Sequence, residues 1–299
     1  MRGRADRPRT VRAVEALARR AVAEDRVRED RTTRALLPRA TPARARVTAE
    51  ARGILSGIAA ARAVARAARL RVVAERREGS AVRPGTVVLR LAGDARSILA
   101  VERTLLNLLM HASGVATATR RVVDATRGAR PRLEVWATRK TLPGLRDLEK
   151  AAVVHGGGRP HRRDLSDGIL VKNNHLALVP LALAVRRARA RARPGEPVEV
   201  EVRSARDAIA AARAGADALL IDNAGPARAR RIVQALAAAG LRRGRWIELS
   251  GGIAPKTVRR YRSVGADAVS LGALTHSAPA LPFHLRIEPG PPRLRPRRP

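Results

Sequence analysis

The sequence predicts an α/β protein in two parts, a compact α/β sandwich followed by a parallel sheet that is closed or nearly closed into a barrel. After residue 133, short apolar runs alternate with alanine-rich helical segments, which is typical of parallel strands joined by helices. Gly-Ala-Asp-Ala at 215–218 recurs at 265–268, and each copy ends a helical segment and begins an apolar run. Before residue 113 there is no fixed period, which favours the sandwich.

Local patterns give the elements of the first part. Pro84-Gly85 predicts a turn before a strand, and 31–38 is expected to pass from a loop into a strand. The basic, proline-rich ends, 1–10 and 289–299, are expected to be disordered. We expect strands over 43–51, 70–75 and 86–91, and helices over 11–23, 56–67, 99–112 and 115–126.

The second part should contain six strands separated mostly by helices. We expect strands over 133–137, 169–171, 198–202, 218–221, 246–249 and 268–271, and helices over 176–193, 205–214, 227–239 and 255–264. Because the carboxyl ends of parallel strands form one rim, the residues that follow these strands should meet there.

Composition narrows the function classes. The 299 residues carry 61 Lys+Arg and a net charge of +35, which suggests a polyanionic or small anionic ligand. The arginines are spread along the whole chain and only four residues are aromatic, so specific nucleic-acid binding is not expected. The absence of cysteine excludes disulfides, thiolate zinc sites and cysteine nucleophiles. No apolar run is long enough to span a membrane, so we expect a cytoplasmic protein.

The residues at the predicted strand ends form an ordered set. Cations follow the early strands, carboxylates the middle strands and glycines the last two. Only four of the basic residues are lysines, and two of these, Lys140 and Lys172, follow strands, which indicates a need for a compact point charge. The strand-end residues are Thr138, Arg139, Lys140, Lys172, Glu201, Asp222, Ser250, Gly251, Gly252 and Gly272.

These residue types suggest how an anionic substrate would bind. The two glycine turns allow backbone N–H groups to approach a phosphate. Glu201 and Asp222 could hold Mg²⁺ or ribose hydroxyls, although structural ion pairs with nearby arginines are an alternative. His161, next to Arg162, is suited to donate to an anion. The sequence lacks the GxxxxGK[ST] motif of P-loop nucleoside triphosphatases. It also has no GxGxxG motif after a strand, so a Rossmann dinucleotide-binding domain is not expected.

Several motifs together resemble the quinolinate phosphoribosyltransferases, the nicotinate-nucleotide pyrophosphorylases of NAD biosynthesis. The resemblance extends from about residue 24 to residue 287. Family members usually carry Asp where this chain has Ala137 and Asn173. These departures affect the electrostatic environment of the neighbouring cations more than they affect the family assignment. The matching stretches are ERTLLN at 102–107, TRKTLPGLR at 138–146, LEK at 148–150, GGGRPHR at 156–162, DGILVKNNH at 167–175, EVEV at 199–202, LIDN at 220–223, SGGI at 250–253 and GALTHSAPAL at 272–281.

The resemblance implies an enzyme that converts quinolinate and phosphoribosyl pyrophosphate to nicotinate mononucleotide, pyrophosphate and CO2 with Mg²⁺. It implies an N-terminal α/β sandwich over 11–112, completed by a strand within 282–288, and an open barrel-like domain over 113–281. It also implies a homodimer in which Arg103 reaches into the partner subunit's site.

The resemblance also assigns roles to the residues of the rim. Arg139, His161, Arg162 and Lys172 would bind the two carboxylates of quinolinate, Lys140 would lie beside the substrate phosphates, and Thr138 would also bind substrate. The residues expected to be catalytic are Lys140, Lys172, Glu201 and Asp222. Glu201 and Asp222 would address the ribose hydroxyls and Mg²⁺, and Ser250, Gly251, Gly252 and Gly272 would bind the 5′-phosphate. The alternatives are a related molybdenum-transport-associated protein, another pyridine-acid phosphoribosyltransferase, or a catalytically dead polyanion-binding protein.

Overall fold

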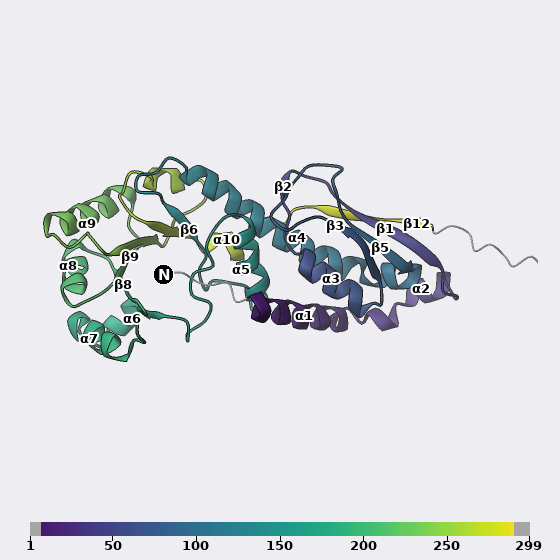
Figure 1. Ribbon diagram of the computed structural model, residues 1–299, viewed down its shortest axis with the longest axis horizontal. Coiled ribbons are helices and arrows are strands. Elements are labelled where there is room, and N and C mark those ends of the chain that lie inside the picture. Colours follow the sequence, from purple (N-terminus) through teal and green to yellow (C-terminus); the bar gives the residue numbers. More distant parts are fainter. Residues whose placement is uncertain (1–6, 290–299) are drawn as a thin grey trace, which may run out of the picture. The chain divides into compact units, whose positions relative to one another are not determined.

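The computed structural model describes residues 7–289 and divides into two compact units (Figure 1). The N-terminal unit comprises 7–117, 143–156 and 278–289, and the C-terminal unit comprises 118–142 and 157–277. Residues 143–156, expected in the barrel, therefore belong to the N-terminal unit. The expected disordered ends lie outside the described residues, except that 7–10 belong to helix α1 and 289 belongs to strand β12.

The N-terminal unit is built on a four-stranded antiparallel sheet in the order β12-β1-β5-β3. Strand β12 pairs with β1 over seven residue pairs, so the last described segment of the chain completes this sheet. A separate two-stranded sheet joins β2 to β4. The strands are β1 (Pro42–Ala49), β2 (Gly53–Ile54), β3 (Arg71–Glu75), β4 (Ala81–Val82), β5 (Val87–Asp94) and β12 (Phe283–Pro289).

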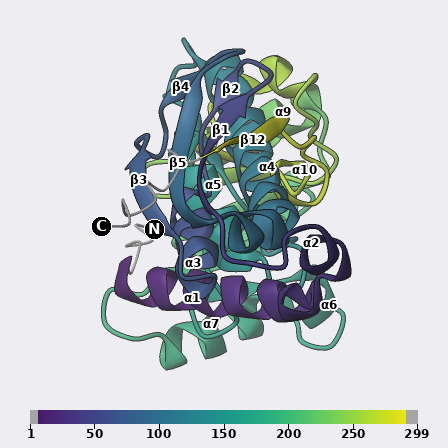
Figure 2. The ribbon, with the colours of Figure 1, turned by 90° about the vertical axis from the view of Figure 1, so that its right-hand side faces the viewer.

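Helices lie against one face of this sheet (Figure 2), and α3 packs there through small aliphatic side chains. On α3, the buried residues are Ile58, Ala60, Ala61, Val64 and Ala65, which recur at helical spacing and form one face. Alternate residues of β1 are buried in the same way, as expected for a sheet with one covered face. The helices of this unit are α1 (Arg7–Glu24), η1 (Val27–Glu29), α2 (Arg31–Leu36), α3 (Ile58–Ala67), the first part of α4 (Ala95–Thr126) and α5 (Arg146–His155).

Several elements of this unit differ from the sequence-based expectation, since the short strands β2 and β4 and the turn η1 were not predicted. The predicted passage from loop to strand at 31–38 is wrong, because 31–36 form α2, whose first turn is capped by the side chain of Asp30 accepting the N–H of Thr33. Helix α5 was not predicted. Its sequence does not have a simple polar face, because Glu149 and Lys150 are both buried.

The C-terminal unit contains a six-stranded, entirely parallel sheet in the order β6-β11-β10-β9-β8-β7 (Figure 1). The first two strands of this unit along the chain, β6 and β7, form the two edges and do not pair with each other. The sheet is therefore open between them, which confirms the predicted open, barrel-like architecture. The strands are β6 (Glu134–Trp136), β7 (Ile169–Val171), β8 (Val198–Val202), β9 (Ala218–Asp222), β10 (Trp246–Ser250) and β11 (Ala268–Ser270).

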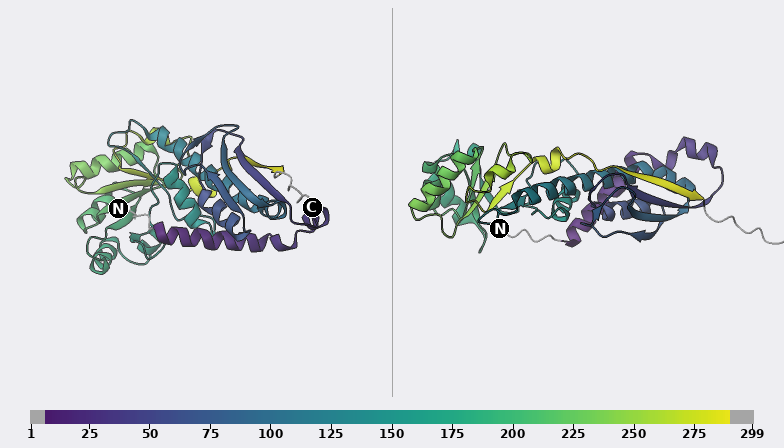
Figure 3. Two further views of the ribbon diagram at one scale, coloured as in Figure 1. Left: turned by 45° about the vertical axis from the view of Figure 1, so that its right-hand side comes forward. Right: turned by 90° about the horizontal axis from the view of Figure 1, so that it is seen from above.

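Three helices, α7 (Leu181–Arg191), α8 (Ala205–Arg213) and α9 (Pro226–Ala238), lie side by side on the outer face of this sheet (Figure 3). The expected helix over 176–193 begins only at Leu181, as α7, because Pro180 lacks the N–H that a helix continuing from residue 176 would need. A separate short helix, α6 (Asn173–Leu176), precedes it. The expected helix over 255–264 is reduced to a 3₁₀ turn, η2 (Val258–Tyr261). There the Thr257 hydroxyl donates to the carbonyl of Ala254 and competes with helix formation. A short helix, α10 (Ala273–His276), follows β11. Within 7–289, no helix combines the length and apolarity needed to cross a membrane.

One close backbone approach in the N-terminal unit gives a stability prediction. A Cβ at Gly114, in the middle of α4, would lie 2.2 Å from the carbonyl oxygen of Pro279. We expect Gly114→Ala to destabilise the protein by about 1–3 kcal/mol, because this overpacking outweighs the gain of about 1 kcal/mol in helix propensity. Urea denaturation measures the change. Gly225→Ala is the control, since no atom lies within 4 Å of its Cβ position; equal midpoints for the two variants would contradict the prediction.

Candidate functional site

The register of the parallel sheet brings the acidic and hydroxyl strand-end residues to one face. Glu201 pairs with Leu220, and Asp222, two residues beyond Leu220, pairs with Ser250. Residues in register on parallel strands point to the same face, as do residues two apart on one strand. Glu201, Asp222 and Ser250 therefore share the inner face of the sheet at its carboxyl edge. The hydroxyl of Ser270 on β11 donates to Ser250 Oγ at 2.9 Å and extends this row.

Asn173 connects the two carboxylates. Its backbone N–H donates to Glu201 Oε2 at 2.9 Å, and its side-chain Nδ2 donates to Asp222 Oδ2 at 3.3 Å. Asp222 also accepts from Arg203 Nη2 at 3.2 Å and from Asn223 Nδ2 at 2.9 Å. The arginine pairing considered as an alternative from the sequence is thus present at Asp222, alongside the link to Glu201 through Asn173.

Two arginines lie close enough to repel each other. The pKa of the half-buried Arg162 guanidinium is lowered, first by burial and then by the positive charge of Arg139. Arg139 Nε is itself buried and makes no hydrogen bond within the described part of the chain. A buried donor without an acceptor is costly, and two neighbouring cations add repulsion. An anion bound between them would relieve both costs.

The glycine turns after β10 and β11 pack closely against neighbouring residues of the site. Gly251 has φ +80°, and a Cβ there would lie 2.5 Å from Asn223 Oδ1. A Cβ at Gly272 would lie 2.8 Å from Lys140 Cδ, so the lysine stem crosses this turn. The backbone of Lys140 is held by Thr138 Oγ1, which accepts its N–H at 3.0 Å, and by the Thr275 hydroxyl, which donates to its carbonyl at 2.7 Å. Lys140 and the Gly272 turn are therefore adjacent.

Lys172 and Arg103 occupy different surroundings. Lys172 ends β7 in an extended conformation and caps α6, and its backbone N–H donates to His175 Nδ1 at 2.9 Å. It is partly exposed at the same edge as Glu201. Arg103 is exposed on α4 in the N-terminal unit, whereas every other predicted site residue belongs to the C-terminal unit.

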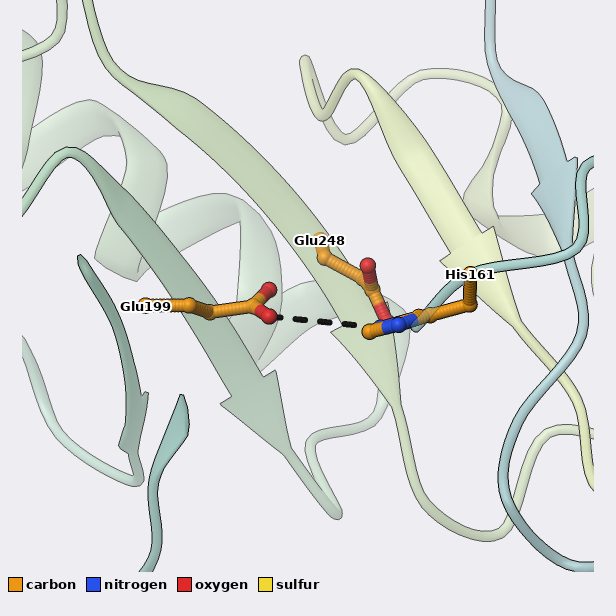
Figure 4. Close-up of side chains that lie close together, drawn as sticks. All are labelled: His161, Glu199 and Glu248. Carbon is orange, nitrogen blue, oxygen red and sulfur yellow. Dashed lines mark ion pairs between the residues drawn. The ribbon is translucent and has the colours of Figure 1, made fainter. Parts of the chain in front are cut away.

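His161 points toward the interior of the sheet, into a cluster that sequence reasoning missed (Figure 4). Its Nε2 lies 3.4 Å from Glu248 Oε1 and 3.9 Å from Glu199 Oε2, and its ring meets the edge of Trp136 at a centroid distance of 5.4 Å. Its Nδ1 accepts the backbone N–H of Arg162 at 2.6 Å. Glu199 lies two residues before Glu201 on β8, one layer deeper on the same face. The alternation Val-Glu-Val-Glu-Val at 198–202 was the available signal for it.

The two carboxylates of this cluster are completely buried. Glu199 and Glu248 are both 0% exposed, and none of their four carboxylate oxygens has a hydrogen-bond partner among the described residues. Burial, and then the charge of Glu248, raise the pKa of Glu199 well above its ordinary value, so the neutral acid is favoured.

The same three side chains could be taken for a metal site, because their ligand atoms all lie within 4.8 Å of one another. A metal-binding histidine normally donates its other ring N–H to an acceptor. Here Nδ1 instead accepts the N–H of Arg162, which assigns the remaining proton to Nε2, the atom that faces the carboxylates. The N–H of His161 Nε2 therefore faces the two carboxyl groups at ion-pair distance, 3.4 Å from Glu248 Oε1 and 3.9 Å from Glu199 Oε2.

Comparisons with known proteins agree with this architecture. The family model described as "Quinolinate phosphoribosyl transferase, N-terminal domain" matches residues 30–113, and the model described as "Quinolinate phosphoribosyl transferase, C-terminal domain" matches residues 115–286. The chain is 41% identical to a probable nicotinate-nucleotide pyrophosphorylase [carboxylating] of Methanothermobacter thermautotrophicus, over 87% of this chain and 93% of the relative. It is 36% identical to the human nicotinate-nucleotide pyrophosphorylase [carboxylating], over 85% of each chain.

A solved structure gives the same result. The nicotinate-nucleotide pyrophosphorylase from Francisella tularensis superimposes with a TM-score of 0.84 at 30% identity, covering 93% of this chain and 97% of that chain. Matches of this extent, across both units, show that the chain belongs to the quinolinate phosphoribosyltransferase family.

Proposed function

We propose that this protein transfers the phosphoribosyl group of phosphoribosyl pyrophosphate to quinolinate, forming nicotinate mononucleotide, pyrophosphate and CO2. Family membership supports this reaction, and the observation that carries it is the pair Arg139 and Arg162, two adjacent cations with an unsatisfied buried donor. Guanidinium groups form two parallel hydrogen bonds with a carboxylate, which suits a planar pyridine diacid.

The diacid would lie between Lys172 and the two arginines, Arg139 and Arg162. The sugar phosphate would lie at the ends of β10 and β11. Lys172 supplies a compact charge at the end of β7. The glycine turns at Gly251, Gly252 and Gly272, with Ser250, bind the 5′-phosphate through backbone N–H groups. Lys140, whose stem crosses Gly272, adds positive charge next to the phosphates.

Glu201 and Asp222 would hold Mg²⁺ and the ribose hydroxyls. Their donor set fits the ion, since Mg²⁺ takes oxygen ligands and commonly uses one or two carboxylates together with substrate phosphates. Bound there, Mg²⁺ would neutralise charge on the pyrophosphate. Asn173 keeps the two carboxylates in one place by donating to both.

Catalysis then depends on position and charge. The cationic rim stabilises the pyrophosphate as it leaves, while Glu201 and Asp222 lie beside the ribose, where positive charge develops. The arginines hold the pyridine nitrogen toward the sugar carbon, so the reaction becomes effectively unimolecular. We further propose that the protein acts as a cytoplasmic homodimer in which Arg103 contributes to the partner subunit's site, as the family resemblance implies.

Replacing Lys172 or Glu201 tests the site. We expect Lys172→Ala and Glu201→Ala to lower quinolinate turnover at least a thousandfold, about 4 kcal/mol, because each removes charge from the reacting centre. Nicotinate mononucleotide formation measures the rate, and thermal melting checks the fold. Arg206→Ala, an exposed cation on α8, is the control. A rate near that of the unaltered protein in either site variant would refute these assignments, and product from nicotinate alone would reject quinolinate as the substrate.

Subunit mixing tests the role of Arg103. Arg103→Ala and Arg139→Ala should each be inactive alone, but an equimolar mixture should regain up to about a quarter of the activity, since about half of its dimers are mixed and one of the two sites in each mixed dimer has both arginines intact. The activity of mixed and unmixed samples is measured after exchange of subunits under mild denaturation. Absence of any recovery, with exchange verified by native mass spectrometry, would argue against a shared site.

Asn173→Asp tests the carboxylate pair. The substitution keeps the shape of the side chain but replaces the Nδ2 donor to Asp222 with a third carboxylate. We expect Mn²⁺ to bind about tenfold more tightly, or ~1.4 kcal/mol, because added ligand charge raises affinity for a hard cation. Paramagnetic resonance of free Mn²⁺ gives the dissociation constant. Asn174→Asp, an exposed neighbour, is the control; equal gains in both variants would indicate a general charge effect.

A further inference from the structure

The buried cluster of His161, Glu199 and Glu248 connects two strands of the parallel sheet to a loop segment of the C-terminal unit. Glu199 on β8 and Glu248 on β10 are separated by strand β9, so their backbones lie about 10 Å apart. Their carboxylates nevertheless converge on His161, which enters from the segment between α5 and β7 (Figure 4). The cluster therefore joins two strands of the sheet to a segment that has no regular secondary structure.

His161 has an unusual backbone that depends on its ring. Its φ is +53°, in the left-handed region that side-chain-bearing residues seldom occupy. The ring turns back on the chain and accepts the N–H of the next residue, Arg162, at Nδ1. This bond leaves Nε2 as the protonated nitrogen, and Nε2 faces Glu248 Oε1 at 3.4 Å. The position of the His161 ring therefore determines the position of the Arg162 backbone N–H.

Maintaining this cluster costs stability. Two completely buried acids with unsatisfied oxygens are unfavourable, whereas apolar residues at the same inward positions would pack without that cost. Buried polar groups of this kind need an explanation beyond stability. The residue that the cluster holds, His161, is directly followed by one of the two arginines of the proposed diacid site.

We propose that Glu248 and Glu199 are positioning residues of the diacid site: they hold the His161 ring with Nε2–H directed inward, and His161 in turn holds the Arg162 backbone so that its guanidinium lies beside Arg139. Neither glutamate is proposed to contact substrate. The effect on substrate binding rests on the proposed function, whereas the effect on His161 does not.

The test distinguishes the effect of losing the side-chain oxygen atoms from the effect of changing the side-chain volume. Glu248→Gln keeps an acceptor for Nε2–H, whereas Glu248→Leu removes it at similar size; Glu199→Gln and Glu199→Leu form the second pair. We expect both Leu variants to raise the quinolinate KM at least tenfold while the phosphoribosyl pyrophosphate KM stays within about twofold. The Gln variants should remain within about threefold of the unaltered protein for both substrates. A uniform loss of kcat with unchanged KM values would overturn the proposal.

A second measurement needs no substrate. With ¹⁵N-labelled histidine, the ring signals of His161, assigned by their loss in His161→Gln, should report an Nε2–H tautomer in the unaltered protein and in Glu248→Gln. In Glu248→Leu we expect exchange between tautomers. An Nδ1–H tautomer in the unaltered protein, or an unchanged signal in Glu248→Leu, would overturn the proposal that Glu248 holds the His161 ring. Stoichiometric metal in the purified protein that is lost in Glu248→Gln would do so as well, by assigning the cluster to a cation.

The N-terminal unit supplies a matched control. Glu149 is likewise 0% exposed and pairs with a histidine, with Oε1 2.9 Å from His111 Nε2. Glu149→Leu removes a buried acid of the same kind and should lower thermal stability without shifting the His161 signals. If the unaltered protein neither binds nor converts quinolinate, the proposed function fails, and the histidine spectra still decide whether Glu248 and Glu199 hold His161.

Discussion

The alternation of side chains along the parallel strands is the constraint on which the site depends. On β8, positions 199 and 201 face inward and positions 198, 200 and 202 face outward. The same alternation on β9 and β10 makes Asp222, Ser250 and Glu248 face inward. Asp222 and Ser250 lie at the carboxyl edge of the sheet, and Glu248 lies deeper inside. A shift of one residue in the register of any strand would exchange its inward and outward sets, so the core and the site are specified together.

The ionisable groups of the C-terminal unit lie at two depths. Arg139, Arg162, Lys140 and Lys172 lie at or near the carboxyl edge, while Glu199 and Glu248 lie below them in the interior. The carboxylates of Glu201 and Asp167 raise the pKa of Arg162 and so oppose the loss of its proton. This arrangement allows cations to be gathered at one edge without an anion present, because part of their mutual repulsion is offset from within the fold.

Much of this organisation could be predicted from the sequence. The strands of the barrel were found within about one residue of their ends, because apolar or alternating runs such as 218–221 and 198–202 are short and bounded by proline or charged residues. Their terminal residues followed directly, since parallel strands have one common carboxyl edge. Helix α5 and the buried acids could not be found in this way. Their polar residues are inside the protein, where only contacts distant in sequence, such as His111 with Glu149 or His161 with Glu248, compensate them.

The return of β12 to the first sheet has a consequence for synthesis of the chain. Strand β1, near the start, has β12 as one neighbour, and their paired residues are more than 230 positions apart. While the ribosome is still producing the barrel, that side of β1 has no partner, and its backbone N–H and C=O groups are open to other strands. The emerging chain therefore carries an unprotected sheet edge until residues 283–289 have been translated, and a stop codon before β12 damages a sheet whose other strands were made more than 180 residues earlier.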